Sequence, residues 1–535
     1  MNVGRAININ PSSSQFVIYS SLIITLVFNY PFIAKVYASV LPDTLWEWAF
    51  FISVPTLLTL INMVFVSVFG AVFFPRLTIA ITFIICALLF YAALVYGVIF
   101  DSSMLQNVME TNSGEAFSYL NMSFLVFFAL LGLMPVFAVL NQEIKGRLST
   151  RIKTLLLVNV LALVGIFLIA AFFYKDYAAV GRNNKGLVKQ IIPYAFYDAG
   201  YKYLRDTYFY PPLPYRILDK HPVIKDAQHA QPQTLVVVVG ETARADKFGS
   251  NGYYRDTTPN LQRLNVVSFG NVISCGTATA VSVPCMFSRL TRDKYDPRIA
   301  SSQDNVLDII HRAGAAVTWI DNNSSCKGVC SRVDSIAFDP QRDPTLCDGD
   351  FCLDEILVKL LQQNMQQHTE NNRVFVLHMI GSHGPTYYRR YPENYARYHP
   401  DCPRSDIQNC KEQALVNTYD NTILYTDYVL SNVVKLLENI PNSAMLYISD
   451  HGESLGEKGL YLHGFPYKLA PAEQTHIPMV YWDSKFSDAE YKSCVTQRAS
   501  QAFSQDNLYD TLLGLTHVSS VTYQPKMDIL SPCKA

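Results

Sequence analysis

Long apolar runs dominate the first 174 residues. Five of these runs are long enough to cross a bilayer, which takes about 20 residues. The third run, Leu77 to Phe100, contains no charged residue. Five successive runs with almost no polar face are not typical of core helices in a soluble protein. We therefore predict a transmembrane domain over residues 1–174, with five helices near 15–37, 46–70, 76–100, 118–140 and 152–174.

The pattern changes beyond residue 231. Short β-branched runs there alternate with longer amphipathic ones, which is typical of parallel strands buried between helices. This pattern predicts an α/β sheet with helices on both faces, in a catalytic domain over residues 232–535. Strands are expected at Leu235–Val239, Ala315–Ile320, Val374–Met379, Ala444–Ile448 and Ile477–Tyr481.

Residues 175–231 join the two parts and are rich in tyrosine, lysine and proline. Aromatic, basic and amphipathic helices of this kind lie on a bilayer surface. The prolines between Pro211 and Pro214 end any helix that reaches them. We predict an interfacial amphipathic bridge that holds the catalytic domain close to the membrane.

The distribution of charged residues predicts how the spans are oriented in the membrane. Only 16% of residues are charged, and the net charge of −1 gives no support to nucleic-acid binding. Basic residues gather at alternate span ends, so the N-terminus is expected in the cytoplasm and everything after about Tyr174 outside it. The first run lacks a signal-peptide cleavage site and is read as retained. The basic residues are Arg5, Arg76, Lys145, Arg147, Arg151 and Lys153.

Polar residues follow four of the predicted strands. Sites in such sheets form beyond the carboxyl ends of the strands. Carboxylate and imidazole groups are zinc ligands, so Glu241, Asp450 and His451 are candidate metal ligands. The four strand ends read Gly240-Glu241-Thr242, Asp321-Asn322-Asn323, Gly381-Ser382-His383-Gly384 and Ser449-Asp450-His451-Gly452.

The segment Cys275–Cys285 places small and hydroxylated residues between two cysteines. A metal beside a hydroxyl lowers its pKa and makes it a nucleophile that can attack phosphorus. Residue chemistry alone leaves Thr277, Thr279 and Ser282 open as that nucleophile.

Further polar residues carry two interpretations each. Asn107, Thr111 and Glu115 recur every four residues and share one helix face, which either is solvated or binds a lipid headgroup. Lys327, His383 and His463 are either functional groups or ordinary surface residues.

Several strings together resemble the lipid A phosphoethanolamine transferases of Gram-negative bacteria, a family that includes transferable colistin-resistance enzymes. The resemblance covers essentially the whole chain. The strings are Gly240-Glu241-Thr242-Ala243-Arg244, Ser274 to Ser288, Gly381-Ser382-His383-Gly384-Pro385, Ser449 to Gly456 and Tyr461-Leu462-His463-Gly464.

The resemblance implies an alkaline-phosphatase/sulfatase-like fold for the catalytic domain. It identifies Thr279 as the nucleophile. It also implies one tightly bound zinc ion, with a second possible, and His383 or His463 as a proton carrier. The implied metal ligands are Glu241, Thr279, Asp450 and His451, and the implied substrate contacts are Asn107, Thr111, Glu115, Asn323, Lys327, His383 and His463.

The implied reaction is ping-pong at the outer face of the inner membrane. Thr279 takes phosphoethanolamine from phosphatidylethanolamine and passes it to a phosphate of lipid A, which weakens the binding of cationic peptides such as polymyxin. The chain is expected to act as a monomer. A lipopolysaccharide core sugar or a periplasmic glucan is the nearest alternative acceptor. A sulfatase is disfavoured because the nucleophile loop lacks the C/S-x-P-x-R motif, and a hydrolytic phosphodiesterase or an inactive binding module is a more distant alternative.

The cysteines fit an oxidising periplasm, because ten of the eleven lie at or beyond Cys275. A zinc–thiolate site is disfavoured because no two CxxC units occur. The spacings suggest the disulfides Cys275–Cys285, Cys326–Cys330, Cys347–Cys352, Cys402–Cys410 and Cys494–Cys533.

Overall fold

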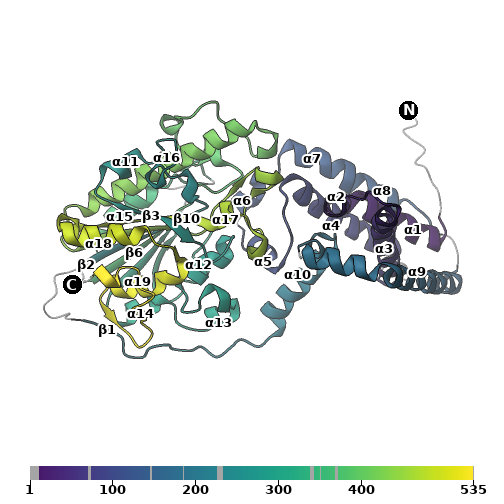
Figure 1. Ribbon diagram of the computed structural model, residues 1–535, viewed down its shortest axis with the longest axis horizontal. Coiled ribbons are helices and arrows are strands. Elements are labelled where there is room, and N and C mark those ends of the chain that lie inside the picture. The colour runs from purple at the N-terminus through teal and green to yellow at the C-terminus, as the bar shows by residue number, and fades with distance from the viewer. Residues whose placement is uncertain are drawn as a thin grey trace. The chain divides into compact units, whose positions relative to one another are not determined.

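A computed structural model describes residues 11–69, 74–111, 113–144, 147–184, 186–225, 233–337, 343–349, 351–367 and 372–533 (Figure 1). Arg5, Lys145, residue 70 of the second predicted span and residues 226–231 of the predicted bridge lie outside these ranges. The chain divides into two compact units, residues 1–102 with 120–202, and residues 103–119 with 203–535. The segment 103–119, expected in the transmembrane domain, thus groups with the C-terminal unit.

The first unit consists of apolar helices. Within the described residues, four of them are long and apolar enough to cross a membrane, and a bent pair, counted as one span, makes five. The four helical spans are α3 (Leu45–Phe69), α4 (Pro75–Val95), the run from α7 (Met122–Phe128) through α8 (Met134–Leu140), and α9 (Leu148–Asn183). The bent pair joins residues Ser13–Phe28, which begin with α1 (Ser13–Ile23), to α2 (Tyr30–Val40) at an angle of 61°.

The bend in the first span has a local cause. Pro31 stands in the first turn of α2, where its missing N–H costs nothing. The side chain of Asn29 supplies the hydrogen bonds that the break would otherwise lose. Its Nδ2 donates to the carbonyl oxygens of Ile24 at 2.9 Å and Ile192 at 2.7 Å, and its Oδ1 accepts from the N–H of Ile192 at 2.8 Å.

Two predicted span ends differ from the observed ones. Helix α4 ends at Val95, and residues 97–100 are not helical, although the apolar run continues to Phe100. Helix α9 continues past the predicted end at residue 174 to Asn183, through non-helical dihedral angles at Phe173. Hydropathy finds apolar length, but helix ends depend on backbone hydrogen bonds and capping.

The C-terminal unit is built on an eight-stranded sheet with helices on both faces (Figure 1). The strand order is β11-β3-β10-β7-β2-β6-β4-β5. The strands are β2 (Gln233–Gly240), β3 (Val267–Ile273), β4 (Ala316–Asp321), β5 (Asp334–Ala337), β6 (Asn372–His378), β7 (Ser443–Ser449), β10 (His476–Asp483) and β11 (Phe503–Ser504).

The helices that cover the sheet match the amphipathic runs. Buried side chains of α12 (Thr279–Phe287), α14 (Val306–Arg312) and α19 (Leu508–Leu515) form one apolar core with Leu235, Val237 and Val239 of β2. The other face carries α15 (Glu355–Gln367) and α16 (Glu412–Leu437) (Figure 1). Because β2 is buried on both faces, it reads as a continuous apolar run.

One predicted strand runs in the opposite direction. Ile477–Tyr481 lies in β10, which pairs antiparallel with both β7 and β3, so this run is not one of the parallel strands that its apolar pattern suggested. Both faces of β10 are buried. A strand that is buried on both faces is a continuous apolar run whether it is parallel or antiparallel to its neighbours, so its sequence does not indicate its direction. Strands β3, β5 and β11 were missed because they are short or interrupted by polar residues.

Candidate active site and metal centre

Two neighbouring parallel strands place the metal-ligand candidates. Strands β2 and β7 pair in register, with Gly240 opposite Ser449. The residues that follow, Glu241 and Asp450, therefore leave the sheet side by side, and His451 comes next. Asp450 is fixed there because its N–H donates to the carbonyl of Gly240 at 2.9 Å.

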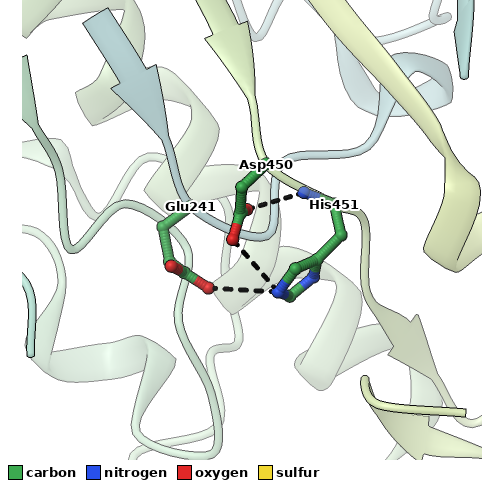
Figure 2. Close-up of side chains that lie close together, drawn as sticks. All are labelled: Glu241, Asp450 and His451. Atoms are coloured by element: carbon green, nitrogen blue, oxygen red, sulfur yellow. Dashed lines mark hydrogen bonds and ion pairs between the residues drawn. The ribbon is translucent and has the colours of Figure 1, made fainter. Parts of the chain in front are cut away.

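Glu241, Asp450 and His451 converge (Figure 2). One ligand atom from each lies within 4.8 Å of the others, and all three residues are fully buried. His451 Nε2 lies 3.5 Å from Glu241 Oε1 and 3.2 Å from Asp450 Oδ2. Asp450 Oδ1 accepts hydrogen bonds from the N–H groups of Thr242 and His451, whereas Oδ2 accepts none from the described residues.

This donor set fits a divalent cation. Two carboxylates buried together without a cation beside them are costly, because burial removes their hydration. His451 Nδ1 lies 2.9 Å from the carbonyl of Gly452, which assigns its hydrogen to Nδ1 and leaves the Nε2 lone pair facing the carboxylates. Burial lowers the pKa of His451 to about 4, so the imidazole is neutral, as a metal ligand must be.

Thr279 reaches this cluster from the first turn of α12. Its Oγ1 lies 3.2 and 3.1 Å from the two carboxylate oxygens of Glu241 and 3.3 Å from His451 Nε2. The other two candidate hydroxyls are engaged elsewhere. Thr277 donates to the carbonyl of Phe465, and Ser282 lies against the carbonyl of Asp450. Of the three, the hydroxyl of Thr279 is thus the one that lies among the ligand candidates.

The two candidate proton carriers lie beside the cluster. The ring centroids of His451 and His463 are 4.5 Å apart, and those of His383 and His463 are 5.3 Å apart. His463 Nδ1 lies 3.1 Å from Glu453 Oε1. Burial, together with the neighbouring His463, lowers the pKa of His383 well below its usual value.

Asn323 lies against Glu241. Its Nδ2 donates to Glu241 Oε2 and to the carbonyl of Met379, both at 2.8 Å. The geometry therefore makes Asn323 a support for a metal-ligand candidate. Such a hydrogen bond fixes the rotamer of the carboxylate side chain and the position of the oxygen that accepts it.

Lys327 lies next to the segment that the sequence related to lipid binding. Its Nζ lies 2.9 Å from Ser324 Oγ and 3.4 Å from the carbonyl of Glu110, at the end of α5 (Ser102–Glu110). Thr111 donates to the carbonyl of Asn107 at 2.8 Å. Helix α6 (Ser113–Ser118) contains Glu115, whose side chain lies outside the described part of the chain.

The ten cysteines beyond residue 274 are paired in the way that their spacing suggested, and Cys86 is buried and free. The disulfides are Cys275–Cys285, Cys326–Cys330, Cys347–Cys352, Cys402–Cys410 and Cys494–Cys533. Two of them close loops of the site, one around Thr279 and one around Lys327.

Sequence reasoning did not assign two buried residues at the site. Glu453 contacts His463. It lies in the polar string that follows β7, and that position could have indicated a role at the site. Gln505 contacts the Thr279 loop and the end of β7, more than 50 residues away from either in sequence, so no local pattern pointed to it.

Comparisons with known proteins relate both parts of the chain to described families. The Sulfatase family matches residues 233–518, and the family described as phosphoethanolamine transferase EptA/EptB matches residues 57–208. The phosphoethanolamine transferase EptA of Salmonella typhimurium is 39% identical over 96% of both chains. The phosphatidylethanolamine transferase Mcr-1 of Escherichia coli is 36% identical over 79% of this chain and 80% of its own.

A solved structure extends the similarity to the whole fold. The integral membrane lipooligosaccharide phosphoethanolamine transferase A of Neisseria meningitidis aligns with a TM-score of 0.94 at 38% identity, over 98% of this chain and 99% of its own. The expected alkaline-phosphatase/sulfatase-like fold is confirmed. This protein belongs to the EptA family of phosphoethanolamine transferases.

Proposed function

We propose that this enzyme transfers phosphoethanolamine from phosphatidylethanolamine to a phosphate of lipid A, through a covalent intermediate on Thr279. The observation that carries the proposal is the position of the Thr279 hydroxyl, 3.1–3.3 Å from the buried ligand candidates Glu241 and His451. A relative whose name includes lipid A in its acceptor, the Kdo(2)-lipid A phosphoethanolamine 7''-transferase of Escherichia coli, is 30% identical over 54% of this chain and 52% of its own.

Glu241, Asp450 and His451 would hold a zinc ion, with Thr279 beside it. Bound there, zinc lowers the pKa of a neighbouring hydroxyl and neutralises negative charge on phosphoryl oxygens. The His451 tautomer, the buried carboxylates and the hydrogen bond from Asn323 to Glu241 all support this assignment.

In the first half-reaction, Thr279 Oγ1 bonds to the phosphorus of phosphatidylethanolamine. The bond from phosphorus to the glycerol oxygen breaks, and diacylglycerol leaves with the proton that Thr279 gives up. The first turn of α12 offers backbone N–H groups and the positive end of the helix dipole to the phosphoryl oxygens. His383 or His463 is placed to carry the proton, because both rings lie beside the cluster.

In the second half-reaction, a phosphate oxygen of lipid A attacks the phosphorus on Thr279. The bond from phosphorus to Oγ1 breaks, and Oγ1 takes up the proton that the attacking phosphate group of lipid A gives up. Lys327 is buried and cationic, so it is suited to hold a phosphate of either lipid. The added ethanolamine amine offsets negative charge on lipid A, so cells that carry the enzyme should resist cationic peptides such as polymyxin.

Both lipids would reach the enzyme at the inner membrane. The proposed orientation has the N-terminus in the cytoplasm and the catalytic domain, residues 232–535, in the periplasm, which the disulfides support. The interfacial bridge, the contact of Asn107, Thr111 and Glu115 with lipid, and a monomeric state stay predictions.

Expression in a strain with unmodified lipid A tests the proposal. Mass spectra of extracted lipid A should gain a phosphoethanolamine increment, which Thr279→Ala abolishes and the matched control Thr277→Ser retains. Tryptic mapping should find the same increment on the Thr279 peptide when the acceptor is withheld. Phosphoethanolamine found only on core sugars or on a glucan would refute lipid A phosphate as the acceptor.

A further inference from the structure

The two loops that form the site do not adjoin in the sheet. The Thr279 loop follows β3, and Asp450 and His451 follow β7, but β10 lies between these strands. Since strands are spaced by about 4.8 Å, β3 and β7 are about 10 Å apart. Among the described residues, β3 and β7 therefore share no direct ladder of backbone hydrogen bonds, and each pairs with β10 instead.

The side chain of Gln505 spans this gap. Its Nε2 donates to the carbonyl oxygens of Ser449 and Asp450, both at 2.8 Å, at the end of β7. Its Oε1 accepts from the N–H of Cys275 at 2.6 Å and lies 2.8 Å from Ser282 Oγ on the Thr279 loop, whose single hydrogen it shares with the carbonyl of Asp450. The carboxamide thus uses both of its N–H groups and both of its lone pairs, and the residue is fully buried.

The backbone of Gln505 is itself anchored. It directly follows β11, which pairs with β3, so the residue is fixed on the side of the Thr279 loop. The preceding Ser504 caps the turn, accepting from the N–H of Asp506 and donating its own N–H to Asn507. The side chain therefore extends from an ordered turn across to the strand that carries the metal-ligand candidates.

We propose that Gln505 is a positioning residue that sets the distance between the Thr279 hydroxyl and the Glu241–Asp450–His451 cluster. The inference rests on the proposed role of Thr279 as the nucleophile. Gln505 acts through the two loops that it joins. Its Nε2 and Oε1 atoms are already occupied by these loops, so they are not available to bind a substrate. Because a misplacement of about 1 Å can cost 10²-fold in rate, its loss should slow the attack by Thr279 and leave donor binding intact.

Two substitutions separate the contacts. Gln505→Glu keeps an acceptor for Cys275 and Ser282 but turns a carboxylate toward the carbonyl oxygens of Ser449 and Asp450. Gln505→Met has a similar length and makes none of the four hydrogen bonds. The matched control is Gln233→Met at the amino end of β2, where Nε2 donates to the carbonyl of Leu515 away from the site edge.

The test uses the full-length protein in nanodiscs with acyl-labelled phosphatidylethanolamine, and measures release of labelled diacylglycerol. Both Gln505 variants should lose about 10- to 100-fold in kcat, while KM stays within about twofold and zinc content is unchanged. Gln233→Met should keep the wild-type kcat. Formation of the phosphoethanolamine adduct on Thr279, measured by mass spectrometry after rapid quenching, should slow by the same factor as kcat.

Two results would overturn the inference. One is a folded, zinc-loaded Gln505 variant with the wild-type kcat. The other is a Gln233→Met variant that loses as much kcat and as much melting temperature as the Gln505 variants do. If Gln505→Met does not fold, Ser282→Ala removes the contact with Gln505 Oε1 together with the contact with the carbonyl of Asp450, and it should lower kcat less than Gln505→Glu does. Equal activity of Ser282→Ala and wild type would then refute the coupling. An active Thr279→Ala enzyme would instead refute the proposed function, so the two failures are distinguishable.

Discussion

Gly452 provides the sharpest structural prediction, because the residue after His451 has no room for a side chain. A Cβ placed there would lie 2.1 Å from the carbonyl oxygen of Glu473, whereas real Cβ contacts below 3.0 Å essentially never occur. Gly452→Ala must therefore move the backbone by about 1 Å, since the obstacle is a backbone atom.

The atoms that would move are in contact with the candidate metal ligand His451. The N–H of Gly452 donates to the carbonyl of Gln474 at 3.0 Å, and its own carbonyl lies 2.9 Å from His451 Nδ1. Moving this peptide unit removes the partner that fixes the His451 ring. We expect a loss of about 1–3 kcal/mol in the free energy of unfolding from overpacking, and about 10²-fold in kcat/KM from the misplaced ligand.

The assay compares zinc content, melting temperature and diacylglycerol release of Gly452→Ala with those of Gly270→Ala. Gly270 is the matched control, because a methyl group at that position would have Asn251 Cγ as its nearest neighbour at 3.5 Å, an ordinary contact. Gly270→Ala should behave like the wild type. A Gly452→Ala enzyme with wild-type kcat/KM and zinc content would refute the reasoning.

Three further predictions follow from other contacts. Glu453→Gln can keep the hydrogen bond to His463 Nδ1, so it should retain far more activity than Glu453→Leu, for which we expect a 10- to 100-fold loss of kcat; equal kcat values would contradict this role. Removal of zinc by a chelator should lower the melting temperature as well as abolish transfer, because it leaves the carboxylates of Glu241 and Asp450 buried without a counter-charge, and added zinc should restore both; an unchanged melting temperature would argue against the metal site. Burial raises the pKa of Asp427 to about 6, above its ordinary value of 3.8, so the folded state binds this proton more tightly than the unfolded state. The contribution of Asp427 to stability should therefore fall by about 3 kcal/mol as the pH rises from about 4 to above 6. The melting temperature of the wild type should rise relative to that of Asp427→Asn as the pH falls from 7 to 5, and a constant difference would contradict the assignment.

The division of this enzyme into a membrane part and an α/β part, and much of its chemistry, can be predicted from the amino-acid sequence. Apolar length marked the spans, because a bilayer admits only runs of about 20 apolar residues. Doubly buried strands appear as continuous apolar runs, and the polar residues that follow them in the sequence indicate that Glu241, Asp450 and His451 form one cluster.

The three candidate hydroxyls can be distinguished only by their positions in the folded protein. Thr277, Thr279 and Ser282 are chemically alike in sequence, but only the hydroxyl of Thr279 lies beside Glu241. The direction of β10 and the grouping of residues 103–119 with the C-terminal unit were likewise invisible to local patterns. Gln505 is the clearest case, because its four partners lie 55 to 230 positions away along the chain, and a side chain's long-range hydrogen bonds leave no periodic signal in sequence.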